Sequence, residues 1–215
     1  MILGALMAGA MFAAAPAALP ADIHPDSMSR LPVIDREKLD PEAKRVYDVI
    51  RGKNPTIGNT GPAAVTMYSP GAAEHFSNLN NYMRKTVVGP RFFELSALTA
   101  AREFDQDYEW TAHEQSGLRS GLEQSVIDVV KFNRDPSGLS EKDQTVIRTA
   151  RSLFHEHKLS SELWAKLVAL FGVQGAVEIV TVMGDYAMAA VVLTAADQRL
   201  PDGRKTTLPV LPRRR

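Results

Sequence analysis

The chain has 215 residues, and its 45% hydrophobic and 23% charged side chains are the balance of a folded globular protein, not of a disordered one. Lysine plus arginine and aspartate plus glutamate each number 25, so the sequence lacks the basic excess of a nucleic-acid-binding protein. It contains no cysteine, which excludes disulfides, thiolate nucleophiles and zinc–thiolate sites.

The first twenty residues are apolar, rich in alanine, methionine and leucine, and carry no charged side chain. An export signal has such a run followed by small residues, which Ala15-Pro16-Ala17 would supply, although the usual basic start is missing. We therefore expect residues 1–21 to be a signal peptide and the protein to be periplasmic or secreted. An uncleaved membrane anchor ranks second, and a cytoplasmic protein with a mis-assigned start codon ranks third.

Residues 22–39 contain several prolines and serines that break any helical period, so they are predicted to form a linker. A helical domain is expected from residue 40 to residue 200. It begins where Asp40 can cap free amides and Pro41 fits the first turn, and apolar residues then recur at helical spacing to residue 51. The glycines, asparagines and proline of residues 54–61 predict a turn-rich loop.

The next helices are predicted from apolar spacing and from the prolines and glycines that separate them. Ser140 and Asp143 form a capping box before one of them, and Gly172 separates the last two. Residues 201–215 read as a polar, proline-containing tail. Since no segment shows the pattern of strands, we predict an all-α fold, a compact bundle of about eight helices. The predicted helices after the first lie at 61–68, 72–87, 90–116, 122–132, 141–157, 160–170 and 174–193.

A polar stripe lies in the predicted helix 90–116. Gln106, Glu109 and His113 are spaced i, i+3 and i+7, so they share one helix face. Glu109 and His113 can meet as a carboxylate–imidazole pair, which is suited to acid–base catalysis. Glu94 lies about four turns earlier and can join them only if the helix breaks, which the acidic residues before Glu109 favour. The same spacing is also typical of a solvated surface pair.

The run from Glu94 to His113 resembles the central motif of the carboxymuconolactone decarboxylase family, which includes the alkyl hydroperoxidase D branch. That branch has a glutamate, eleven residues, a Cys-x-x-Cys pair, three residues and a histidine, and here Gln106 and Glu109 stand at the two cysteine positions. Glu109, Trp110 and His113 are similar to the Glu-Trp-x-x-His of the cysteine-free branch. The resemblance covers about residues 40–205 and implies an alkyl hydroperoxidase D-like helical fold.

The resemblance implies a lyase that decarboxylates a small carboxylated lactone or a related organic acid. Under this hypothesis His113 donates a proton to the carbon that loses carbon dioxide, Glu109 is its partner and can exchange roles with it, and Glu94 tunes or relays the proton. Neither a cofactor nor a metal is expected.

Three further residues are candidates for substrate binding. Arg102 would hold a substrate carboxylate through a two-pronged contact, and the alternative is an ordinary surface arginine. Gln106 and Trp110 would wall the pocket, and the alternative for the tryptophan is a place in the core. His155 and His157 invite a metal interpretation, but side chains two apart on a helix point about 200° away from each other and do not share an ion.

Two other functions stay open. Thiol peroxidase activity belongs to the hydroperoxidase branch, but it needs a thiolate to attack the peroxide, so the absence of cysteine disfavours it. A non-catalytic binding or scaffold protein on the same fold would use the glutamates and the histidine as structural ion pairs.

The resemblance also implies a homo-oligomer, and the strongly apolar helix 174–193 is the predicted interface because so hydrophobic a helix has to be buried. Glu178 and Asp185 lie seven apart on this helix and so share a face. We expect that face to meet solvent or a neighbouring subunit, and the alternative is that both carboxylates line a cavity.

Overall fold

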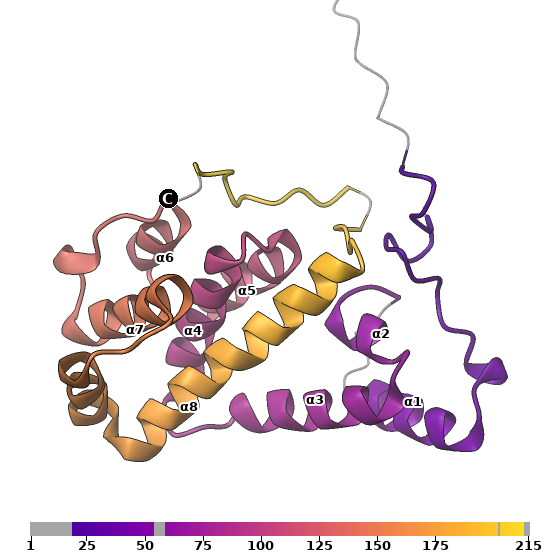
Figure 1. Ribbon diagram of the computed structural model, residues 1–215, viewed down its shortest axis with the longest axis horizontal. Helices are drawn as coiled ribbons and strands as arrows, with labels where there is room; N and C mark the ends of the chain where they lie inside the picture. Colours follow the sequence, from indigo (N-terminus) through magenta and orange to yellow (C-terminus); the bar gives the residue numbers. More distant parts are fainter. Residues whose placement is uncertain (1–18, 54–58, 202, 213–215) are drawn as a thin grey trace, which may run out of the picture.

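The structure, a computed structural model, describes residues 19–53, 59–201 and 203–212. Within these ranges it contains eight α-helices and no β-sheet, so the predicted all-α bundle of about eight helices is confirmed (Figure 1). The predicted signal peptide, residues 1–21, lies almost entirely outside the described residues, and so does most of the predicted loop 54–61.

The helices lie close to the predicted positions in the sequence. Short 3₁₀ turns lie at Arg36–Lys38 and Pro136–Gly138, and a π-helical turn, Ser152–Glu156, continues the seventh helix. In Figure 1 the long α8 crosses the bundle, with α4 and α5 behind it, α6 and α7 to one side and α1 to α3 to the other. The helices are α1 (Pro41–Lys53), α2 (Pro62–Thr66), α3 (Pro70–Met83), α4 (Gly89–Glu103), α5 (Asp107–Arg119), α6 (Gln124–Lys131), α7 (Glu141–Arg151) and α8 (Ser161–Ala195).

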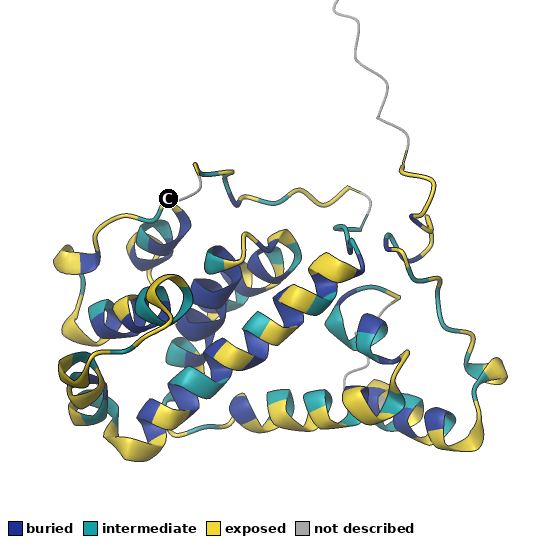
Figure 2. Cartoon of the chain, viewed as in Figure 1, coloured by how far each residue is buried: buried dark blue, intermediate teal, exposed yellow. Residues whose placement is uncertain are grey.

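Helix α4 is the centre of the fold. It packs against α5, α6, α7 and α8, and all ten residues from Phe93 to Arg102 are buried (Figure 2). One side, with Leu95 and Leu98, belongs to the main apolar core, and the other, with Phe93 and Ala97, packs on α8. A helix that is buried on every side fixes its side chains firmly, and this holds for Glu94 within the same run.

The predicted helix 90–116 is two helices. Helix α4 ends at Glu103, Asp105 has a positive φ of 51°, and Gln106 caps α5 by accepting a hydrogen bond from the Tyr108 amide. A left-handed residue followed by a capping side chain turns the chain sharply. The two helices therefore pack on each other, and the break that Glu94 needed to meet the later residues is present.

Two other local predictions are confirmed. The Ser140 hydroxyl accepts a hydrogen bond from the Asp143 amide at 3.2 Å and so caps α7. Gly172 has non-helical backbone angles, φ 72° and ψ 168°, which interrupt α8 where two separate helices were predicted. This combination of angles is available almost only to glycine.

The predicted linker, residues 22–39, makes contacts with the helical domain. The Arg30 amide donates to the Ala196 carbonyl at 2.8 Å, and the Gln198 side chain donates to the Ser27 carbonyl at 2.9 Å. The chain after α8 also packs, because Leu208 is buried in the main core. The first of these segments thus contacts the end of α8, and the second packs on the main core.

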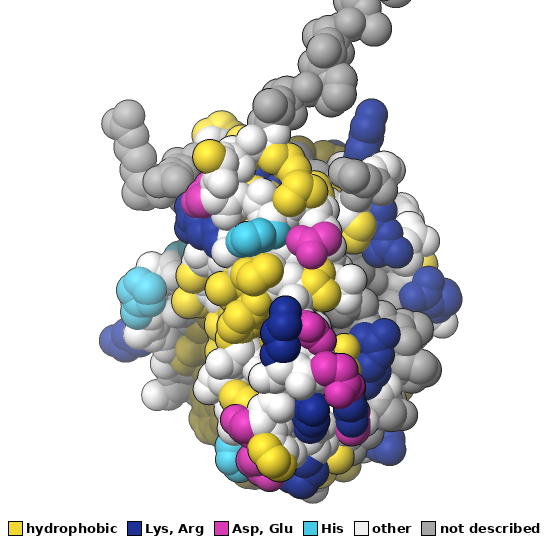
Figure 3. All heavy atoms as spheres, turned by 90° about the vertical axis from the view of Figure 1, so that its right-hand side faces the viewer, with side chains coloured by type: hydrophobic (Ala, Val, Ile, Leu, Met, Phe, Trp, Pro, Cys, Tyr) yellow, Lys and Arg dark blue, Asp and Glu magenta, His cyan; other side chains and the backbone are white. Residues whose placement is uncertain are grey.

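The outer face formed by α1 and the residues before it carries charges of both signs. Figure 3 shows acidic and basic side chains next to each other over the lower part of this face. Arg36 pairs with Asp48 and Arg45 pairs with Glu74, at 2.5 and 2.8 Å. Exposed pairs of this kind contribute little to stability, and they leave no basic patch here for a nucleic acid.

Candidate active site

His113 is buried between two carboxylates. Its Nδ1 lies 2.7 Å from Oε2 of Glu94 on α4, and its Nε2 lies 3.6 Å from Oε2 of Glu109 on its own helix. All three residues are at most 6% exposed. The α4–α5 packing thus brings the three predicted catalytic residues together, and their burial excludes a solvated surface pair.

Aromatic side chains fix the plane of the imidazole. The His113 ring stands edge-on to the Tyr186 ring, with centroids 4.6 Å apart and an interplanar angle of 81°. Phe93 lies on another side, 6.3 Å from the imidazole and 5.8 Å from the tyrosine ring. Packing of this kind, together with the Glu94 contact, leaves the imidazole one orientation, in which Nε2 points to Glu109.

Glu109 and His113 line a cleft of about 420 Å³. Its walls come from α3, α5 and α8 and from the segments around α2 and Pro201. This volume suits a small organic molecule. Glu94 does not line the cleft, so it can act there only through His113.

A polar network from the end of α3 and from α8 also lines the cleft. The Asn80 amide donates to Asp185 Oδ2 at 2.9 Å and to Tyr186 Oη at 3.4 Å, and Arg84 Nη2 donates to the same phenol oxygen at 3.3 Å. Glu109 Oε1 and Asp185 Oδ1 are buried with no hydrogen-bond partner within the described part of the chain. Buried polar atoms in native proteins are nearly always paired, so these two oxygens are suited to a bound molecule.

Burial raises the pKa of three groups in the cleft. It raises the pKa of Glu109, against the attraction of His113 and Arg84. It also raises the pKa of Asp185, against the hydrogen bond from Asn80, and raises the pKa of Tyr186 far enough to keep its phenol neutral. Groups that keep their protons to unusually high pH are suited to proton donation.

Arg102 does not lie where the substrate hypothesis needs it. Its side chain is buried beside the C-terminal segment, donating to the Pro209 carbonyl at 2.9 Å and pairing with Asp105. It does not line the cleft. Its contacts tie the α4–α5 turn to the chain end, which is a structural role.

Gln106 and Trp110 also have structural contacts outside the cleft. The Gln106 amide donates to Thr194 Oγ1 on α8 at 3.1 Å while its oxygen caps α5. Trp110 is fully buried in the main core, and its indole N–H donates to Thr207 Oγ1 at 3.1 Å. The core alternative therefore describes Trp110 correctly.

The polar network of the cleft did not enter the predicted site; it consists of Asn80, Arg84, Asp185 and Tyr186. Of these four, only Asp185 stood out in the sequence, because a carboxylate is unusual inside an apolar helix. A cavity lined by this carboxylate was the alternative interpretation. Glu178 does not share its surroundings, since it accepts the Val87 amide at 3.0 Å and lies outside the cleft.

The histidines of the predicted metal alternative do not form a metal site. His155 Nε2 pairs with Glu103. In the part of the chain that the structure describes, no three potential metal ligands of the usual types come together.

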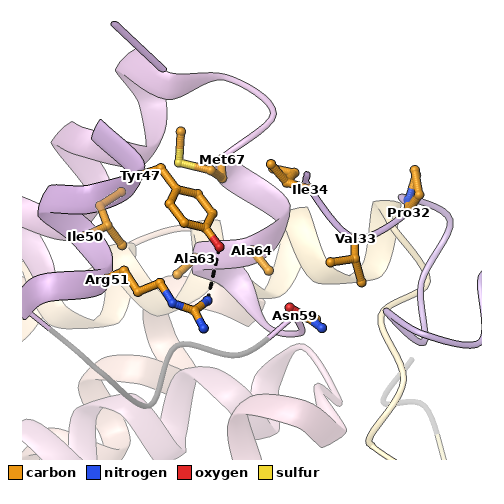
Figure 4. A pocket seen from close by; sticks show the side chains of 10 residues that line it. All are labelled: Pro32, Val33, Ile34, Tyr47, Ile50, Arg51, Asn59, Ala63, Ala64 and Met67. Carbon is orange, nitrogen blue, oxygen red and sulfur yellow. Dashed lines mark hydrogen bonds between the residues drawn. The ribbon is translucent and has the colours of Figure 1, made fainter. Parts of the chain in front are cut away.

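A second hollow lies between α1, α2 and the residues before α1, and Figure 4 shows its lining. Val33, Ile34, Ile50 and Met67 make it mainly apolar, and the Arg51 guanidinium donates to Tyr47 Oη at its edge. Its volume of about 40 Å³ is room for a few water molecules only.

A third hollow, of about 480 Å³, lies beside Glu114, Arg119 and Lys205, and none of the predicted catalytic residues lines it. The cleft lined by Glu109 and His113 is therefore the candidate active site, because of the groups it holds and not because of its size.

Comparison with known proteins adds no assignment. No protein-family model matches this chain, and no curated protein matches its sequence. Function therefore has to be inferred from the cleft and from the motif between Glu94 and His113.

Proposed function

We propose that this protein is an acid–base lyase, similar to the carboxymuconolactone decarboxylase family, that removes carbon dioxide from a small carboxylated lactone or a related organic acid. The observation that carries the proposal is the buried series Glu94, His113 and Glu109, of which only the last two reach the cleft. An imidazole held at one nitrogen by a carboxylate, with the other nitrogen beside an acid of raised pKa, is equipment for moving a proton.

The reaction needs one proton and no redox partner. The bond between the substrate carboxylate and its neighbouring carbon breaks, carbon dioxide leaves, and the electron pair stays on that carbon, stabilised by the conjugated carbonyl. The proton shared by Glu109 and His113 is then delivered to the carbon, and solvent replaces it. Glu94 touches no substrate in this scheme and is a positioning residue, because its contact with Nδ1 keeps Nε2 directed at Glu109.

In this proposal Arg84, not Arg102, binds the substrate carboxylate. It lines the cleft at its exposed edge, where it donates from Nε to Asn80 and from Nη2 to Tyr186. A guanidinium has further N–H groups in the same plane, and these are suited to a substrate carboxylate. Arg204 lines the cleft as well and adds positive charge.

Tyr186 is suited to the substrate carbonyl. Its oxygen accepts hydrogen bonds from Asn80 and Arg84, and the neutral phenol keeps a proton of its own to donate. A donor aimed at an oxygen that gains negative charge during the reaction lowers the barrier. Thiol peroxidase activity receives no support, because the sequence offers no thiolate.

The test is release of carbon dioxide from a panel of carboxylated lactones and keto acids by the purified full-length protein. We expect turnover of at least one compound, and loss of about 10²- to 10⁴-fold in kcat in His113→Asn and Glu109→Gln. His155→Asn and Glu178→Gln are matched controls, since both residues are held by protein contacts outside the cleft.

Two outcomes would contradict the proposal. Equal turnover by wild type and His113→Asn removes the histidine from the reaction. Binding of these acids in the cleft without any release of carbon dioxide would instead identify a binding protein, for which the unpaired oxygens of Glu109 and Asp185 are equally suited.

A further inference from the structure

The third hollow borders the candidate active site, because Ala112 and Arg204 line both. One wall comes from α5, and the other comes from residues 204–207, which we call the tail segment. In Figure 1 the chain after α8, drawn in yellow, runs back over α5. The hollow is therefore built from two parts of the chain that lie far apart in the sequence.

Hydrogen bonds hold the tail segment against α5. Thr207 Oγ1 donates to Glu114 Oε2 at 2.5 Å and accepts from the Trp110 indole N–H at 3.1 Å. The Lys131 ammonium lies 2.6 Å from the other oxygen of Glu114. Glu114, Trp110 and Lys131 are all buried, so the two walls keep a fixed distance from each other.

Three cations line the third hollow: Arg119, Arg204 and Lys205. None of the three forms an ion pair with another residue that the structure describes, and Arg119 donates to the Ser116 hydroxyl at 2.8 Å. The one carboxylate among the described lining residues is Glu114, which Lys131 neutralises. Three positive charges gathered in this way repel one another and attract an anion.

A buried hydroxyl without a partner lies on the α5 wall. Thr111 Oγ1 forms no hydrogen bond within the described part of the chain. A threonine inside a helix commonly donates to the carbonyl four residues earlier, as Thr66 and Thr145 do here. Thr86 and Thr149 also lack a partner, but they line none of the three hollows. Since buried polar atoms are nearly always paired, the free hydroxyl of Thr111 is a second indication of a ligand.

We propose that the third hollow binds a multivalent oxyanion, between the Thr111 hydroxyl on α5 and the cations of both walls. Guanidinium and ammonium groups form their strongest hydrogen bonds with charged oxygens of phosphate and carboxylate. The ligand carries at least two negative charges, because the cations come from two separate segments and one carboxylate does not satisfy them all. The volume of about 480 Å³ accommodates a small organic or phosphate-bearing molecule. This proposal does not depend on the function proposed above.

Calorimetric titration of the full-length protein with pyrophosphate and with citrate tests the site. The ionic strength is kept low and constant, because salt screens contacts between exposed charges. We expect one molecule of anion bound per chain, and no binding of chloride in the same range. Binding of pyrophosphate alone identifies a phosphate-bearing ligand, and binding of citrate alone identifies a polycarboxylate.

Variants of the two walls locate the anion. Arg119→Gln and Lys205→Gln should each weaken binding about 10-fold, since each removes one charge-assisted hydrogen bond. Thr111→Val keeps the shape of the side chain and removes the hydroxyl, so it should weaken binding about 3- to 10-fold. Arg84→Gln, in the cleft, and Arg134→Gln, which is exposed elsewhere, are the controls and should leave the affinity unchanged.

Trp110 supplies a second measurement from within the site, through its hydrogen bond to Thr207. The chain has two tryptophans, so Trp164→Phe leaves Trp110 as the only one, and its emission should change along the same binding curve. Three results would overturn the proposal. They are no binding of either anion, equal weakening by Arg134→Gln and Arg119→Gln, which indicates unspecific attraction, or stronger weakening by Arg84→Gln than by Arg119→Gln, which places the anion in the cleft.

Discussion

Glu94 and His113 lie on different helices, nineteen residues apart, yet Oε2 of the glutamate is 2.7 Å from Nδ1 of the histidine. The contact joins α4 to α5 across the interior of the fold. It occupies the imidazole nitrogen that faces the core and leaves the other nitrogen towards the cleft. One hydrogen-bonded contact thus contributes both to the packing of two helices and to the orientation of the group proposed to move a proton.

Removing Glu94 should destabilise the protein. Glu94→Ala leaves the buried Nδ1 of His113 without a partner, which costs about 1–3 kcal/mol in the free energy of unfolding. Glu94→Gln keeps an oxygen at the same place, so its free energy of unfolding should decrease less. Urea denaturation of these variants measures the difference, with Glu123→Ala as the control because that carboxylate forms an exposed ion pair with Arg91. Equal stability of Glu94→Ala and Glu123→Ala would contradict the structural role.

The raised pKa of Glu109 predicts how stability depends on pH. The carboxyl ionises near pH 4.5 in the unfolded chain, but burial raises its pKa in the folded protein. Between these two values the folded protein holds the extra proton, so this group lowers the free energy of unfolding as pH rises. Glutamine does not ionise. As the pH rises from 5, the thermal unfolding midpoint should therefore fall less in Glu109→Gln than in wild type. Parallel curves of the midpoint against pH for the two proteins would contradict the prediction.

The sequence predicts the helices well because their signals are local. Pro41 at a helix start, the Ser140 cap and the break at Gly172 act within one or two turns, and each is present in the structure. The acidic residues before Glu109 indicate a break near Asp105, but the sequence does not give the direction in which the chain turns there, since a left-handed aspartate has no strong pattern of its own. That turn decides whether Glu94 is remote from His113 or beside it.

The cleft is harder to predict because it is made by segments far apart in the chain. Asn80 on α3 and Arg84 just after it read as ordinary polar positions, and only packing against α8 places them beside Asp185 and Tyr186. Arg102 shows the opposite case, since its charge near the motif favoured substrate binding while the tertiary fold gives it backbone partners. Spacing defines which residues share a helix face, but contacts between helices decide which face meets a cavity.

Gln198 should hold the early segment and the cleft edge together. Its amide donates to the Ser27 carbonyl at 2.9 Å, and its oxygen accepts the Gly61 amide at 3.2 Å. Gln198→Ala leaves both buried groups unpaired, at about 1–3 kcal/mol each, so residues 22–31 should open more often. Trypsin should then cleave after Arg30 faster than in wild type.

A matched control exists for this proteolysis experiment. Gln144 also donates to backbone carbonyls, those of Ser137 and Leu139, but on the far side of the bundle. Gln144→Ala should leave the cleavage rate after Arg30 unchanged. Equal rates for wild type and Gln198→Ala would show that other contacts fix this segment.

Arg84 should set the affinity for substrate. Arg84→Lys keeps the positive charge but loses the planar fork that can hold a carboxylate, Asn80 and Tyr186 together. One charge-assisted hydrogen bond contributes about 1.5–3 kcal/mol, so the KM for an acid that the protein decarboxylates should rise about 10- to 100-fold. The kcat should change less, because binding of the carboxylate precedes the proton transfer.

Arg134→Lys is the control for Arg84→Lys, because it makes the same substitution at an arginine outside the cleft. Both guanidinium groups stack on a phenylalanine, Arg84 on Phe93 at 4.9 Å and Arg134 on Phe132 at 4.7 Å, but Arg134 lies outside the cleft. Arg134→Lys should leave KM unchanged. If both variants keep the wild-type KM, the substrate carboxylate is bound elsewhere, and Arg204 is then the cation that the cleft still offers. If Arg84→Lys lowers kcat and leaves KM unchanged, the arginine acts on the transition state through Tyr186 instead.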